Sequence, residues 1–210
     1  MILRVLLLFF LCVPSVLQAD FEDFSFGPVR QPLRYKEDFF RLNAKWLTRD
    51  ADSLSRSIYF LELASVLPFD HPIKALIPIQ TEQQYEKYQL ALMMHIMLQL
   101  TDSYIQYGNL YMKNKLYFYN KEFAKDYADG YDVAQFYHRS ARLYWQKTMD
   151  YAQKAGAISV ELNPELSHTL VHFDDMISKV RKGLVDYNKP LDKLESDIAS
   201  NRSVLESWQL

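Results

Sequence analysis

The chain has 210 residues, of which 49% are apolar, 15% aromatic and 24% charged, and its formal net charge is −2. This composition predicts a folded domain with a hydrophobic core and excludes a disordered chain, a polytopic membrane protein and a basic nucleic-acid-binding protein. The chain has only five glycines. They are too few for a large β fold or a Gly-rich phosphate-binding loop, so we expect an all-α fold.

Residues 1–19 have the pattern of a secretory signal peptide. Arg4 precedes an unbroken apolar stretch, residues 5–13, and the small residue Ala19 ends a cleavage site. The stretch is shorter than the roughly 20 residues of a membrane-spanning helix, so an uncleaved inner-membrane anchor is the weaker alternative. The only cysteine, Cys12, lies inside this segment. An exported domain without disulfides is typical of a bacterial periplasm, and we expect a periplasmic or secreted protein.

An extended N-terminal arm is predicted for residues 20–34, where Gly27, Pro28 and Pro32 interrupt any helical period. The arm carries three phenylalanines that should not face water: Phe21, Phe24 and Phe26. We therefore expect the arm to pack on its own domain or on a partner.

Residues 35–210 are predicted to form a single all-helical domain of six or seven helices in antiparallel hairpins. The first helix is expected at about 35–48, and Asp52 or Ser53 is expected to cap the second. Three prolines within residues 68–78 then predict a loop.

The longest helix is predicted to begin at Thr81, which forms a capping box with Gln84. Residues 90–98 are apolar nearly all round the helix, which is typical of a helix at the centre of a bundle. Glycines predict the later boundaries, with a break at Gly130 and a helix end at Gly156.

A heptad pattern marks the last third of the chain. Apolar residues spaced by four and three run from Leu166 to Tyr187, and a second stripe runs from Leu191 to Trp208. The proline of the connecting sequence, Pro190, suits a first helical position. These patterns predict a C-terminal antiparallel αα-hairpin that closes like a short coiled coil.

Ten of the fifteen tyrosines lie between residues 104 and 151. They are expected to form either an aromatic groove or the interface between two helices. Within this segment, Tyr104-x2-Tyr107-Gly108-x2-Tyr111 is followed by Tyr151-Ala152-Gln153-Lys154-Ala155 and Glu161-Leu162-Asn163-Pro164-Glu165. Over residues 101–165 this pattern resembles the tetratricopeptide repeat, although the second-helix Ala and Phe positions of a repeat fall out of register. The resemblance implies helical hairpins that bind other proteins, as in envelope assemblies and the collar of periplasmic flagellar motors.

Two histidine patterns are candidates for metal binding. Glu165-x2-His168-x3-His172 has the spacing of half a di-iron bundle site, but no second Glu-x-x-His occurs in the chain. His168 and His172 also fall opposite the heptad stripe, so a solvated polar face is the favoured interpretation. His95 lies among methionines, where a buried core histidine is favoured over a ligand. We expect no cofactor.

These patterns together favour a non-enzymatic periplasmic scaffold or adaptor that binds another envelope protein. No combination of nucleophile, base and oxyanion donor is recognisable. The candidate contact residues are the three phenylalanines of the arm and four tyrosines: Tyr107, Tyr111, Tyr137 and Tyr144. Two alternatives stay open: a small-ligand or sugar-binding module that uses the same tyrosines, and a metal-binding bundle. We expect no nucleic-acid partner and no membrane span after signal cleavage.

Overall fold

The structure is a computed structural model that describes residues 33–43, 50–113, 119–162 and 172–208. This part of the chain forms α-helices and two short 3₁₀ turns, Pro72–Lys74 and Lys121–Phe123, without a strand. The α-helices are α1 (Lys36–Asn43), α2 (Ala51–Val66), α3 (Glu82–Asn109), α4 (Ala124–Ala157), α5 (Phe173–Arg181) and α6 (Asn188–Trp208). The predicted all-α fold is confirmed. The predicted signal peptide and the three phenylalanines of the arm lie outside the described residues.

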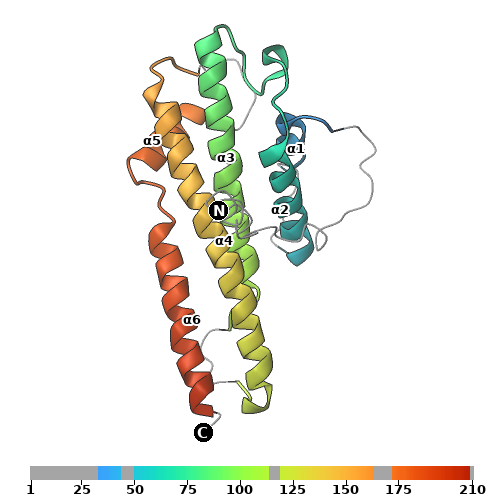
Figure 1. Cartoon of the computed structure of the whole chain (residues 1–210), viewed down its shortest axis with the longest axis vertical. Helices are drawn as coiled ribbons and strands as arrows, with labels where there is room; N and C mark the ends of the chain where they lie inside the picture. The colour runs from blue at the N-terminus through green and yellow to red at the C-terminus, as the bar shows by residue number, and fades with distance from the viewer. Residues whose placement is uncertain (1–32, 44–49, 114–118, 163–171, 209–210) are drawn as a thin grey trace, which may run out of the picture.

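The long helices α3 and α4 form an antiparallel pair on which the other helices pack (Figure 1). Helix α2 packs on α3 and α1 packs on α2, whereas α5 and α6 pack on α4. In Figure 1, α1 and α2 lie beside the upper half of the pair, and among the labelled helices only α6 accompanies its lower half. The two ends of the α3–α4 pair are therefore covered by different helices.

Helix α3 is the central helix of the core, as its sequence predicts. The predicted capping box is present: Thr81 Oγ1 accepts a hydrogen bond from Gln84 N at 3.1 Å, and Gln84 Oε1 accepts one from Thr81 N at 3.3 Å. Every residue from Ala91 to Met97 is buried, and α2, α4 and α5 all pack on α3.

Three predicted boundaries differ from the structure. Helix α2 is capped by Asp50, whose Oδ1 accepts from Ser53 N at 3.0 Å, and so begins slightly earlier than expected. Gly130 lies inside α4 and does not break it. A Cβ at this position would lie 3.2 Å from Tyr111 O, so the glycine leaves room for the segment that follows α3. Gly156 lies in the last turn of α4, where Arg181 Nη1 donates to its carbonyl oxygen at 3.1 Å.

The C-terminal helices differ from the predicted heptad hairpin. Helix α5 ends at Arg181, short of Tyr187, because Gly183 adopts a left-handed φ of 67°. Leu184 N donates to Lys179 O at 2.9 Å, which closes a Schellman motif, and the Leu184 side chain is 73% exposed. The residues of the first stripe before α5, Leu166 and Leu170, lie outside the described part.

Helices α5 and α6 each pack on α4 and not along one another. Arg142 of α4 donates to Asp192 at 2.8 Å and to Glu195 at 3.2 Å, and Arg202 of α6 pairs with Asp132. These contacts run in opposite directions along the two helices, so α6 is antiparallel to α4. The heptad stripe of α6 therefore packs on α4 and not on α5.

Gly108 allows α3 and α4 to approach closely. A Cβ on this residue would lie 2.8 Å from His138 Cδ2 and Nε2 and 3.2 Å from Ala134 O. His138 is fully buried, and its Nε2 lies 3.2 Å from Asn109 Oδ1. The glycine of the repeat-like sequence thus sits at a point of close helix contact.

We expect Gly108→Ala to lower the free energy of unfolding by about 1–3 kcal/mol, as overpacking of a filled interface does. An unobstructed helix would instead gain about 0.5–1 kcal/mol from the same change. Chemical denaturation shows whether the substitution lowers or raises the free energy of unfolding. In the double variant Gly108→Ala/His138→Ala, the loss should be smaller than the sum of the two single losses. A more stable Gly108→Ala variant would contradict the observed contact.

Candidate functional site

The central aromatic feature is a row of five tyrosines across the α3–α4 interface, which we call the tyrosine row: Tyr104, Tyr107, Tyr111, Tyr137 and Tyr144. Tyr104 and Tyr144 stack with ring centroids 5.4 Å apart and an interplanar angle of 10°. Tyr107 meets Tyr137 edge to face at 4.8 Å, and Tyr111 stacks on Tyr137 at 6.1 Å. Such offset and edge-to-face pairs add about 0.5–1.5 kcal/mol beyond burial.

Glu62 of α2 anchors one end of the tyrosine row. Its carboxylate is buried and accepts hydrogen bonds from the hydroxyls of Tyr104, at 3.0 Å, and Tyr144. Burial, reinforced by the charge of Glu62, raises the pKa of both tyrosines. Both hydroxyls therefore stay protonated and act as donors at neutral pH, which compensates the buried carboxylate.

The tyrosines of the row differ in exposure. Tyr104 is buried, at 4% exposure, whereas the four residues that the sequence singles out are half-buried: Tyr107, Tyr111, Tyr137 and Tyr144. The row is thus a helix–helix interface, which is one of the two interpretations left open by the sequence, and four of its five tyrosines are partly accessible.

Three apolar side chains on α4 extend this surface. Val133, Phe136 and Leu143 are 36%, 45% and 40% exposed, and Phe136 meets Tyr137 edge to face at 5.4 Å. At about 100° per residue they lie within about 120° of Tyr137 and Tyr144 on one side of the helix. We call these three residues together with the half-buried tyrosines the aromatic face.

The structure brings together all four predicted tyrosines, but it adds residues that sequence analysis missed. Glu62 is a lone acidic residue within the apolar pattern of α2, which is a signal for a buried polar contact. Phe136 and Leu143 are seven residues apart, so they share one side of a helix. Their exposure depends on which neighbours cover α4, and the periodicity alone does not determine that.

The structure describes only part of the metal-binding candidates. Glu165 and His168 lie outside the described residues, and His172 is an exposed residue that precedes α5. His95 is buried, and its ring meets those of Phe40 at 6.4 Å and Phe173 at 5.1 Å edge to face. Within the described ranges, no three His, Cys, Asp or Glu side chains are arranged to hold a metal ion.

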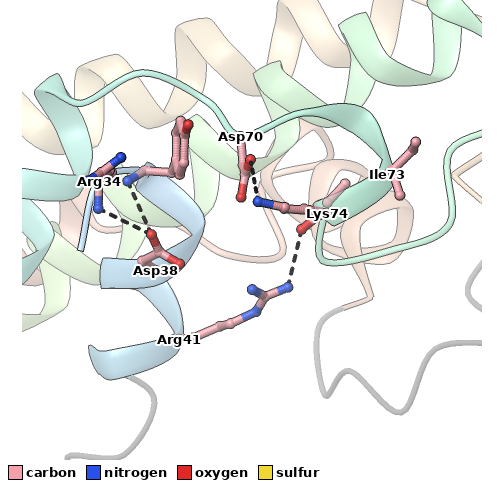
Figure 2. A pocket seen from close by; sticks show the side chains of 8 residues that line it. Arg34, Asp38, Arg41, Asp70, Ile73 and Lys74 are labelled. Carbon is pink, nitrogen blue, oxygen red and sulfur yellow. Dashed lines mark hydrogen bonds and ion pairs between the residues drawn. The ribbon is translucent and has the colours of Figure 1, made fainter. Parts of the chain in front are cut away.

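A polar recess of about 530 Å³ lies between α1 and the loop that follows α2 (Figure 2). Its walls carry three cationic and two anionic side chains: Arg34, Arg41, Lys74, Asp38 and Asp70. Asp38 accepts from two backbone N–H groups at the start of α1, at 3.2 and 3.3 Å. Asp70 lies 3.9 Å from Lys74 Nζ, and Arg41 donates to the Lys74 carbonyl at 3.3 Å. The recess offers more donors than acceptors and suits an anionic group.

The described fold and surface define an all-α protein with a partly exposed aromatic face on a long antiparallel hairpin. The model of a family described as "Domain of unknown function (DUF8513)" matches residues 83–208, and the chain belongs to this family. The matched segment contains the whole tyrosine row, whereas Glu62 and the polar recess precede it. No curated protein and no solved structure matches the chain.

Two further observations bear on the sequence interpretation. In the described part, none of the helices has both the length and the apolar character that crossing a bilayer requires.

Helix α4 alone has 34 residues, whereas a tetratricopeptide repeat places two helices and a turn in about that length. The single long helix α4 differs from that arrangement, and the resemblance of residues 101–165 to the repeat stays a prediction.

Proposed function

We propose that this protein is a non-enzymatic scaffold or adaptor of the bacterial periplasm, and that its aromatic face binds another protein of the cell envelope. The observation that carries the proposal is the exposure of Val133, Phe136 and Leu143 on one side of α4. Contiguous exposed apolar surface beside aromatic rings is typical of protein-binding sites.

The packing of the tyrosine row favours a protein partner over a sugar. A sugar-binding site needs a concave cavity with convergent polar groups, but the rings of the row stack on one another. The polar recess is not lined by any residue of the row. A broad aromatic surface with polar hydroxyl tips instead suits contact with another protein.

The proposed periplasmic location is inferred from the N-terminal sequence. The short apolar stretch after Arg4 and the possible cleavage after Ala19 support export, and the mature chain would contain no cysteine. N-terminal sequencing of the purified mature protein should find Asp20 as the first residue. An intact Met1 would contradict cleavage.

Site-specific photo-crosslinking tests the binding surface. A photoreactive phenylalanine analogue at Phe136 is expected to crosslink one discrete envelope protein in cells that express the full chain. The matched control carries the analogue at Gln146, an exposed position on another side of α4. The double variant Phe136→Ala/Leu143→Ala should weaken binding of the purified partner at least tenfold. Its stability should change little, because both side chains are partly exposed.

Two results would contradict the proposed surface. One is an equal yield of the same crosslinked product from Phe136 and Gln146. The other is unchanged affinity of the double variant for the partner.

A further inference from the structure

A second cleft lies at Lys36 and shares no lining residue with the polar recess. It has a volume of about 360 Å³ and lies among α1, the end of α2, α3 and α4. Binding sites for small molecules begin at about 300 Å³. Half of its lining residues are apolar or aromatic (Phe69, Leu90, Met93 and Tyr151), and the other half are polar or charged (Lys36, Ser65, Glu86 and Gln89).

The ammonium group of Lys36 is the unusual feature of this cleft. The residue is only 5% exposed, and its Nζ donates to Ala64 O at 3.0 Å and Ser65 O at 2.7 Å. These are carbonyl groups at the C-terminal end of α2, where a cation is favourable. The same Nζ lies 5.2 Å from the centre of the Phe69 ring.

No carboxylate among the described residues pairs with this ammonium within 4.0 Å. The adjacent Glu37 is engaged elsewhere, since it accepts from Asp70 N at 3.0 Å and from the Tyr88 hydroxyl at 3.1 Å. Glu86, at the rim of the cleft, is exposed to water. Buried charges are normally paired, whereas the Lys36 cation has no counter-ion in the described part of the chain.

An ammonium group has three N–H donors, and two of those on Lys36 are accounted for by the two carbonyl oxygens. The third donor has no hydrogen-bond partner among the described residues, and Lys36 itself lines the cleft together with Ser65 and Phe69. Burial lowers the pKa of Lys36 to about 8, and the neighbouring charge of Glu37 opposes this shift. The amine is therefore mostly protonated at pH 7.

We propose that this cleft binds a small monocarboxylic acid with an apolar chain, with the carboxylate on Lys36 and the chain against Phe69, Leu90 and Met93. The carboxylate supplies the counter-ion that the described residues do not provide for the buried cation. The apolar part of the wall favours such a chain over a small, fully hydrated anion such as phosphate. This proposal does not depend on the aromatic face.

The test titrates the mature full-length protein with octanoate and, as an uncharged analogue, with 1-octanol, using calorimetry at pH 7. Octanoate is expected to bind saturably at one site, and 1-octanol at least tenfold more weakly. Octanoate affinity should also fall as the pH rises through about 8, where Lys36 loses its proton. An ordinary surface lysine would lose its proton only near pH 10.4.

A cavity-filling variant provides the second readout, because Lys36→Met also removes a donor to α2 and can unfold the protein. Leu90→Trp should reduce octanoate affinity at least tenfold while circular dichroism shows an unchanged fold. The matched control, Leu184→Trp, changes an exposed residue away from the cleft and should bind like the wild type. The proposal fails if octanoate does not saturate, if 1-octanol binds equally well, or if Leu90→Trp binds octanoate as tightly as the control.

Discussion

Replacing Glu62 by alanine is expected to lower the free energy of unfolding by about 2–4 kcal/mol, because it leaves two hydroxyls of the tyrosine row without their acceptor. The hydroxyls belong to Tyr104, which is buried, and Tyr144, which is half-buried. The substitution also removes the hydrogen bonds that join α2 to both α3 and α4. Chemical denaturation followed by circular dichroism measures the loss.

Two further variants make this prediction specific. Glu62→Gln keeps one acceptor oxygen in place and should cost less than Glu62→Ala. Glu86→Ala removes an exposed glutamate from α3 and should change the stability by no more than about 0.5 kcal/mol. Equal effects of Glu62→Ala and Glu86→Ala would show that Glu62 does not anchor the row.

Acidification is expected to destabilise the protein through His95. Burial lowers the pKa of His95 from 6.5 to about 4, and its Nε2 has no hydrogen-bond partner among the described residues. The unfolded chain therefore binds a proton near pH 6.5 that the folded state binds only near pH 4. The stability that depends on neutral His95 is complete above pH 6.5 and is lost as the pH falls toward 4.

The comparison with His95→Met isolates this effect, because methionine has no titrating group and adapts to an irregular core. Between pH 7 and pH 4.5, the wild type should lose about 2–3 kcal/mol more stability than the variant. Exposed His71 provides the control, and His71→Gln should leave the pH dependence close to that of the wild type. Parallel pH profiles of wild type and His95→Met would contradict a buried, neutral His95.

The candidate site was only partly predictable from sequence. The spacing of Tyr104, Tyr107 and Tyr111 places them on one side of a helix, and that inference needs only the helical period. Their contacts with Tyr137 and Tyr144 depend on how α3 and α4 align, which a local pattern does not specify. Glu62 is remote from both segments in the sequence, so no spacing rule relates it to the row.

The same reasoning applies to the cleft at Lys36. The sequence shows an ordinary lysine followed by a glutamate near the start of a short helix. Only the fold places Lys36 under the end of α2 and directs Glu37 toward Asp70 and Tyr88. The absence of a counter-ion among the described residues is therefore a property of the packed structure.

The all-α class, the capping box at Thr81 and the buried segment Ala91–Met97 are determined by the sequence itself, because they follow from composition and from interactions within one or two helical turns. Tertiary packing decides that Gly130 continues α4, that α6 pairs with α4 in place of α5, and that Glu62 accepts from two tyrosines. Each of these features depends on contacts between residues that lie far apart in the chain. Such contacts stabilise the protein only after the helices have packed together, so a local sequence pattern does not predict them.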